Sequence, residues 1–200
     1  MNYKEVFLEA ASVMWGYAKF IHLLFPEEWK VGVSGIPPEI NARQTIEGTN
    51  WVLSGYINVG VLPDVGRPRE RMYLRVKIDN AVTEPRLKEW LRQNCERIKR
   101  SGSKKMDEAG YINVGNHKGA YVIWTVKKRR FGFFGETIRE AKLVSVFHCD
   151  LTSRKIKLEF FTSHPTLLLD NKKEIFNVIS SIGCHGHAKK NIVILDNDSG

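Results

Sequence analysis

The sequence predicts an α+β fold in which an antiparallel sheet is sandwiched by helices. Apolar and polar residues alternate after Gly119 and again over residues 142–162, which is the period of a strand with one buried face. Residues 84–100 and 171–183 instead carry apolar side chains on one side at helical spacing. A chain of 200 residues, 42% of them hydrophobic, suits one domain, which we place at residues 1–187 with a flexible tail at 188–200.

The first part of the chain is expected to be mostly extended. A short helix is predicted at residues 3–15, and residues 35–46, which contain two prolines, are expected to form a loop or an irregular edge. The predicted strands cover residues 17–25, a short segment from about residue 30, and residues 51–62 and 72–78. The hexapeptide Gly-Tyr-Ile-Asn-Val-Gly occurs at 55–60 and again at 110–115, and we interpret the two copies as similar strand segments rather than a solenoid repeat.

Two helices are predicted in the rest of the chain. Thr83 can cap the first helix, and Pro85 fits its first turn, where the missing N–H costs nothing. The second helix is predicted to begin near Asn171 and to end at Gly183, a typical C-cap residue. The polar turn at 150–154 makes residues 142–162 a hairpin.

Charge and cysteine content restrict the partners and the compartment. The formal net charge of +9 favours a polyanionic partner, either nucleic acid or an acidic protein. Three cysteines do not make a secreted disulfide framework. Glu9, Lys19 and His22 interrupt the apolar run at residues 6–25, so we expect neither a signal peptide nor a transmembrane segment, and a cytoplasmic protein.

The order of these elements resembles that of the PsbP-like superfamily over roughly residues 20–185. The resemblance is carried by Phe25-Pro26-Glu27-Glu28-Trp29, by Gly119-Ala120-Tyr121, by Asp150-Leu151-Thr152-Ser153-Arg154 and by Phe176-Asn177-Val178-Ile179-Ser180-Ser181-Ile182. It implies an α/β/α sandwich and a non-catalytic binding or assembly factor. The sequence also contains no GxSxG, no P-loop, no GxGxxG before a helix and no HExxH, so an enzyme is not the expected function.

Two Cys-His segments form a candidate metal site. One is His148-Cys149 at the end of a predicted strand, and the other is Cys184-His185-Gly186-His187 after the last helix. Thiolate and imidazole groups suit zinc, so Cys149, Cys184 and His185 are the predicted ligands, with His148 or His187 completing the set. Because adjacent strand residues point to opposite faces, His148 and Cys149 cannot easily serve one site. A Cys149–Cys184 disulfide and inert core cysteines are the alternatives.

A basic and aromatic loop is the candidate partner-binding surface. Its residues are Lys127, Lys128, Arg129, Arg130, Phe131, Phe133 and Phe134. Cations can contact phosphates or carboxylates, and exposed aromatic rings can stack on bases. The predicted function is a non-catalytic binding or assembly module that uses this rim of the sheet. The alternatives are a nucleic-acid-binding protein that also uses a basic helix at residues 86–105, and a metal or redox protein. The partner, the metal and the oligomeric state stay open at this stage.

Overall fold

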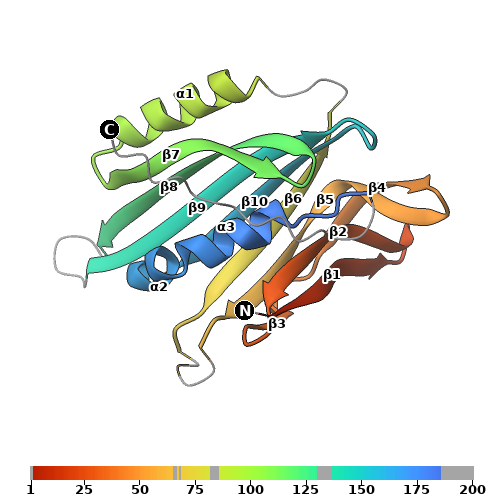
Figure 1. Ribbon diagram of the computed structural model, residues 1–200, viewed down its shortest axis with the longest axis horizontal. Coiled ribbons are helices and arrows are strands. Elements are labelled where there is room, and N and C mark those ends of the chain that lie inside the picture. Colours follow the sequence, from red (N-terminus) through yellow and green to blue (C-terminus); the bar gives the residue numbers. More distant parts are fainter. Residues whose placement is uncertain (1, 65–66, 68, 82–85, 130–136, 186–200) are drawn as a thin grey trace.

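The structure is a computed structural model that describes residues 2–64, 67, 69–81, 86–129 and 137–185 (Figure 1). These residues form ten strands and three helices. The strands are β1 (Tyr3–Ser12), β2 (Gly16–Pro26), β3 (Lys30–Val33), β4 (Glu39–Ile46), β5 (Thr49–Leu62), β6 (Met72–Asn80), β7 (Lys104–Val114), β8 (His117–Arg129), β9 (Thr137–Cys149) and β10 (Arg154–Thr162). The helices are α1 (Leu87–Lys99), α2 (Pro165–Asp170) and α3 (Lys172–Ser180).

All ten strands belong to one mixed, mostly antiparallel sheet. Its main path runs β1-β2-β5-β6-β10-β9-β8-β7, and β3 and β4 also pair with β5. The strands after residue 117 are antiparallel neighbours, as the alternation predicts. Phe147 of β9 lies between Gly119 of β8 on one side and Ile156 of β10 on the other. The parallel contact is a bridge between Lys19 of β2 and Trp51 of β5. The fold class is therefore α+β with a larger sheet than the sequence predicted.

The helices lie on different faces of the sheet. The outer face, as we define it, carries α1, whose Ile98 packs with Val122 and Trp124 of β8. The inner face carries α2 and α3, and there Phe176 of α3 packs edge-on against Tyr121 of β8. In Figure 1, α1 runs beside β7, whereas α2 and α3 lie in front of the middle of the sheet. Successive side chains of a strand point to opposite faces of the sheet, so one strand can contact helices on both faces. In β6 and β10, every second residue is buried, and the residues between them point to the other face.

An ionic contact fastens α3 to the inner face. Glu108 of β7 accepts hydrogen bonds from the Tyr121 hydroxyl at 2.5 Å and from Lys172 Nζ at 2.7 Å. Burial opposes ionisation of Glu108, but these two donors outweigh it and hold the pKa of the carboxyl below its usual value.

Three predicted elements were wrong or incomplete. The helix predicted at residues 3–15 is absent. Residues 3–12 form strand β1 and residues 13–15 a turn, because Tyr3 to Ser12 pair with β2 and pairing overrides weak helical periodicity. Residues 35–46, predicted as a loop or an irregular edge, contain strand β4, which pairs with β5 with register shifts between Ile40 and Arg43. The closing helix α3 begins at Lys172 with Asn171 as its N-cap, as predicted, but a separate helix, α2, precedes it and was not predicted. Helix α3 ends at Ser180 rather than at Gly183, because Gly183 exchanges backbone hydrogen bonds with His22 of β2.

Both copies of the hexapeptide lie in strands, β5 and the end of β7, but their first glycines differ in function. Gly55 has φ of +155°, and a Cβ there would lie inside the contact distance of the Glu39 carbonyl oxygen. Gly110 has an ordinary φ, and its added Cβ would meet the Tyr121 side chain at 3.2 Å. The first copy therefore needs glycine for a close backbone approach of β4.

Some predicted features lie outside the described residues. They are the Thr83 and Pro85 helix start, the loop residues 130–136, His187 and the tail at 188–200. Among the helices that the structure describes, none has the length and apolar character needed to cross a bilayer. The apolar run at residues 6–25 lies in strands β1 and β2.

Candidate metal centre

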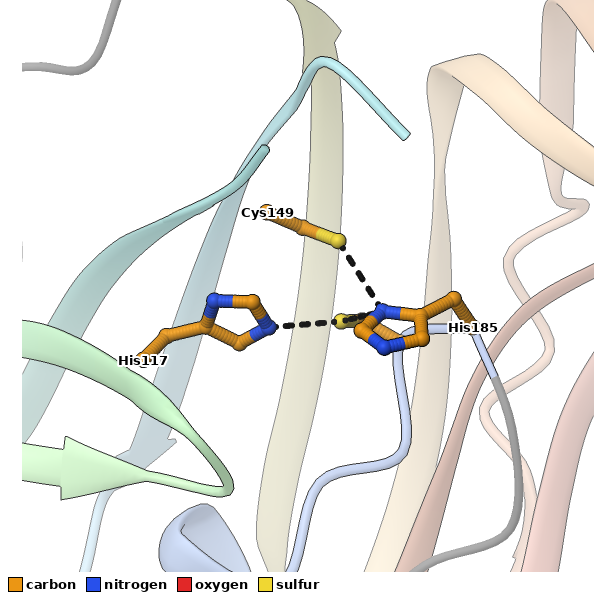
Figure 2. A group of neighbouring side chains, drawn as sticks. His117, Cys149 and His185 are labelled. Atoms are coloured by element: carbon orange, nitrogen blue, oxygen red, sulfur yellow. Dashed lines mark hydrogen bonds between the residues drawn. The ribbon is translucent and has the colours of Figure 1, made fainter. Parts of the chain in front are cut away.

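Four soft donor side chains come together at one end of the sheet (Figure 2). His117 is the first residue of β8, after the tight turn that follows β7. Cys149 is the last residue of β9. Since Gly119 pairs with Phe147, continuing the register brings His117 and Cys149 to the same end and the same face of neighbouring strands. Cys184 and His185 belong to the segment that follows α3.

The donor atoms are already close to the spacing that one metal ion requires. Cys184 Sγ lies 3.2 Å from His117 Nε2 and 3.1 Å from His185 Nδ1, and Cys149 Sγ lies 3.2 Å from His185 Nδ1. All four donor atoms lie within 4.8 Å of one another. In a tetrahedral zinc site, bonds of about 2.0–2.3 Å separate the ligand atoms by about 3.3–3.8 Å. Small side-chain adjustments would therefore suffice to bind zinc.

The centre lies at the border between the core and the solvent. Cys149 is 0% and Cys184 is 2% exposed, whereas the two histidines are partly exposed. The His117 ring stacks on Phe147 with ring centroids 5.7 Å apart, which fixes its orientation. The thiols therefore come from the protein side of the centre, and the imidazoles cover it toward the solvent.

A fully buried arginine lies beside the two cysteines. The Arg154 guanidinium donates hydrogen bonds to the carbonyl oxygens of Phe20 and Val52 at 3.0 and 2.9 Å, to the carbonyl oxygen of Cys184, and to the Thr152 hydroxyl. Within the described part of the chain, Arg154 makes no ion pair with a carboxylate. Burial lowers the pKa of Arg154 to about 10, and the negative charge of the cysteines opposes this shift. Cys149 and Cys184 are thus the acidic side chains that act on this desolvated cation.

The electrostatics favour a thiolate at Cys149 and a neutral thiol at Cys184. The hydrogen bond from Cys184, together with bonds from His117 and Thr152, lowers the pKa of Cys149 despite its burial. The same contact with Cys149, together with burial, raises the pKa of Cys184. The Cys149 sulfur also raises the pKa of His117. Metal ligation requires deprotonated sulfur, so the Cys149 side of the centre is prepared for it.

The structure brings together the three ligands that the sequence singled out, Cys149, Cys184 and His185. His148 points away, as strand alternation predicts, with its ring nitrogens 2.8 Å from the Ala81 carbonyl oxygen and 2.9 Å from Asp150. His117 was missed, although the register of β8 and β9 would have indicated it. All three cysteines are free thiols, and Cys95 packs in the separate cluster under α1.

The predicted partner-binding surface is described only in part. Lys127 is exposed near the end of β8, and the backbones of Lys128 and Arg129 belong to the same strand. Arg130, Phe131, Phe133 and Phe134 lie outside the described residues.

The helix that was expected to extend this surface has part of its positive charge paired within the helix. Arg92 of α1 is bound by Glu89 at 2.7 Å and by Glu96 at 2.6 Å, and Glu96 also pairs with Arg100. Salt bridges within the helix therefore occupy part of the charge that was predicted to contact phosphates.

Comparison with known proteins identifies a similar topology. No family model matches the chain, and no curated protein matches it. Among solved structures, the chain is similar to cyanobacterial PsbP from Synechocystis, with a TM-score of 0.42 and 13% sequence identity over 90% of this chain and 92% of that chain. The expected resemblance to PsbP is thus present in the order of the elements, and it is one of topology alone.

Proposed function

We propose that this chain is a non-catalytic binding or assembly protein, an α/β/α sandwich of the PsbP type, with a structural zinc ion. His117, Cys149, Cys184 and His185 are the proposed ligands. The observation that carries the proposal is the convergence of their four donor atoms within 4.8 Å from three separate segments.

The donor set favours zinc in a structural position. Two thiolates and two imidazoles are a common zinc ligand set, and four protein ligands complete a tetrahedron without an open position for substrate. A catalytic zinc ion keeps one position for water, so the same set argues against metal-dependent catalysis. Thiolate ligands persist in a reducing compartment such as the cytoplasm, which is where we place the protein.

Arg154 favours metal ligation over the disulfide alternative. A Cys149–Cys184 disulfide would replace two sulfurs that can carry negative charge with two neutral atoms. The buried guanidinium would then lose the groups whose charge offsets its desolvation. Ligation keeps both sulfurs as thiolates and retains the hydrogen bond from Arg154 to the Cys184 carbonyl.

The ion would fasten the segment after α3 to the sheet. Gly183 already joins β2 through two backbone hydrogen bonds with His22, of 2.9 and 3.0 Å. The next two residues, Cys184 and His185, supply half of the ligands, and β8 and β9 supply the others. The proposed ion therefore links the β1-β2 end of the molecule with the β8-β9 end.

The test is the metal content of protein purified under reducing conditions. We expect about one zinc per chain by elemental analysis, and three thiols after denaturation with a chelator. Cys184→Ser and His117→Ala should lower the zinc content strongly, and Cys95→Ala, the matched control, should leave it unchanged. A wild-type protein that takes up no zinc, or that shows only one free thiol, would contradict the proposal.

A further inference from the structure

The outer face of the sheet contains an open aromatic and basic surface over β6, β10 and β9. Phe161 of β10 lies opposite Tyr73 of β6 on one side and Lys142 of β9 on the other, so the three form one cross-strand row. The two rings stack with centroids 5.5 Å apart and an interplanar angle of 22°. Both aromatic side chains are partly exposed. Helix α1 packs on β7 and β8 instead, so it leaves this row open.

A pocket opens at this row. Its volume is about 310 Å³, and its lining residues are Tyr73, Glu140, Lys142, Phe161, Thr162 and Ser163. Aromatic rings, hydroxyls, an ammonium group and the Glu140 carboxylate therefore surround one hollow. Rings offer a stacking surface to a planar base, and the lysine can contact a phosphate beside it.

Cations continue along the two central strands from this pocket. Lys77 of β6 lies directly opposite Lys157 of β10. Their side chains are 52% and 34% exposed, and each pairs with a carboxylate on its own strand, Asp79 and Glu159 respectively. Like charges directly opposite each other destabilise a sheet. Asp79 and Glu159 offset part of this repulsion, and a phosphate between the two lysines would offset more of it.

The whole surface is biased toward positive charge. Its cations outnumber its carboxylates: Arg75, Lys77, Lys142, Lys155 and Lys157 stand against Asp79, Glu140 and Glu159. Arg75 and Lys142 also lie over the Phe161 ring, 5.8 and 5.7 Å from its centroid.

We propose that this outer face binds single-stranded nucleic acid. A base occupies the Tyr73–Phe161 pocket, and the phosphates follow Lys142 and the opposed pair of Lys77 and Lys157. The inference names the partner of the proposed binding module and does not depend on the zinc ion. A single strand is the fitting form because its bases are free to stack on protein rings, whereas the bases of a duplex are stacked inside it.

The test is fluorescence anisotropy of labelled single-stranded DNA and RNA oligonucleotides with the full chain, over a series of salt concentrations. We expect binding that weakens steeply with salt, and weaker binding to a duplex of the same length. Lys77→Ala with Lys157→Ala should reduce the slope of log affinity against log salt by about 1.4, because a single strand contributes about 0.7 per phosphate contact. Tyr73→Leu with Phe161→Leu should weaken binding about tenfold, since leucine keeps apolar bulk but cannot stack.

A matched control removes two exposed cations elsewhere, Arg43 of β4 and Lys173 of α3. Arg43→Ala with Lys173→Ala changes the net charge equally and should leave the affinity within about twofold. Protection from lysine acetylation gives a second readout on the unmutated chain, with Lys142 and Lys157 protected by the oligonucleotide and Lys173 unprotected. No binding at low salt, equal losses in the control variant, or a preference for duplex would overturn the proposal, whatever the zinc content of the protein.

Discussion

Replacing Cys184 with serine should abolish the stabilisation of the fold by zinc. Cys184 is 2% exposed, and its sulfur is within 3.2 Å of two other proposed ligand atoms, so the hydroxyl of serine cannot replace the thiolate at this position. An ion that binds only the folded state stabilises it by about 4.1 kcal/mol when its free concentration is 1,000 times the dissociation constant. For a domain of about 150–250 residues, 1 kcal/mol shifts the melting temperature by about 2–4 °C, so zinc should raise it by roughly 8–16 °C.

The assay is thermal unfolding followed by circular dichroism, in reductant, with zinc and again with a chelator in excess. Wild-type protein should show the full shift, and Cys184→Ser should unfold at nearly the same temperature in both buffers. Cys95→Ala should keep the zinc shift, although its melting temperature falls slightly because Cys95 of α1 packs against the apolar cluster between α1 and the sheet. The reasoning is wrong if zinc stabilises Cys184→Ser as much as wild type, or if Cys95→Ala and Cys184→Ser respond identically.

Three further substitutions test other parts of the structure. Arg154→Met should lower the free energy of unfolding in urea by about 2–4 kcal/mol, because three carbonyl oxygens lose their hydrogen-bond donor. It should also lower the zinc affinity measured by competition with a chelator. Unchanged values for both quantities would contradict this prediction. The ionised Glu108 carboxylate stabilises the fold above its usual pKa, and this contribution is lost as the pH falls through the lowered pKa. On acidification below about pH 4.5, Glu108→Gln should therefore lose less stability than wild type. The expected difference is about 1 kcal/mol at most. Gly55→Ala should cost about 3 kcal/mol and Gly110→Ala about 1, and equal costs would show that β4 does not restrict Gly55.

The sequence predicted the second half of the fold better than the first. Alternation over residues 142–162 and the one-sided stripe near Ile175 and Phe176 reflect burial that is local to one strand or one helix. Residues 3–12, predicted as part of a helix, form a strand because β2 pairs with them, and no local sequence pattern indicates that pairing.

The candidate metal centre could also be predicted only where its residues share a local sequence pattern. Cys149, Cys184 and His185 were found because each lies in a Cys-His segment, and the side-chain alternation of β9 placed His148 on the other face. His117 has no such neighbour in the sequence. It joins the centre only through the register of β8 with β9, and a shift of one residue would turn its ring to the opposite face.

The distribution of the four ligands along the chain also determines when the centre can form. His117 and His185 are far apart in sequence, so the chain must close long loops before an ion gains all four ligands. Such contacts form late, after the rate-limiting step of folding, and stabilising them slows unfolding without accelerating folding. Zinc should therefore act mainly on the lifetime of the native state, and a newly made chain would gain this protection only after its last ligand, His185, has been synthesised.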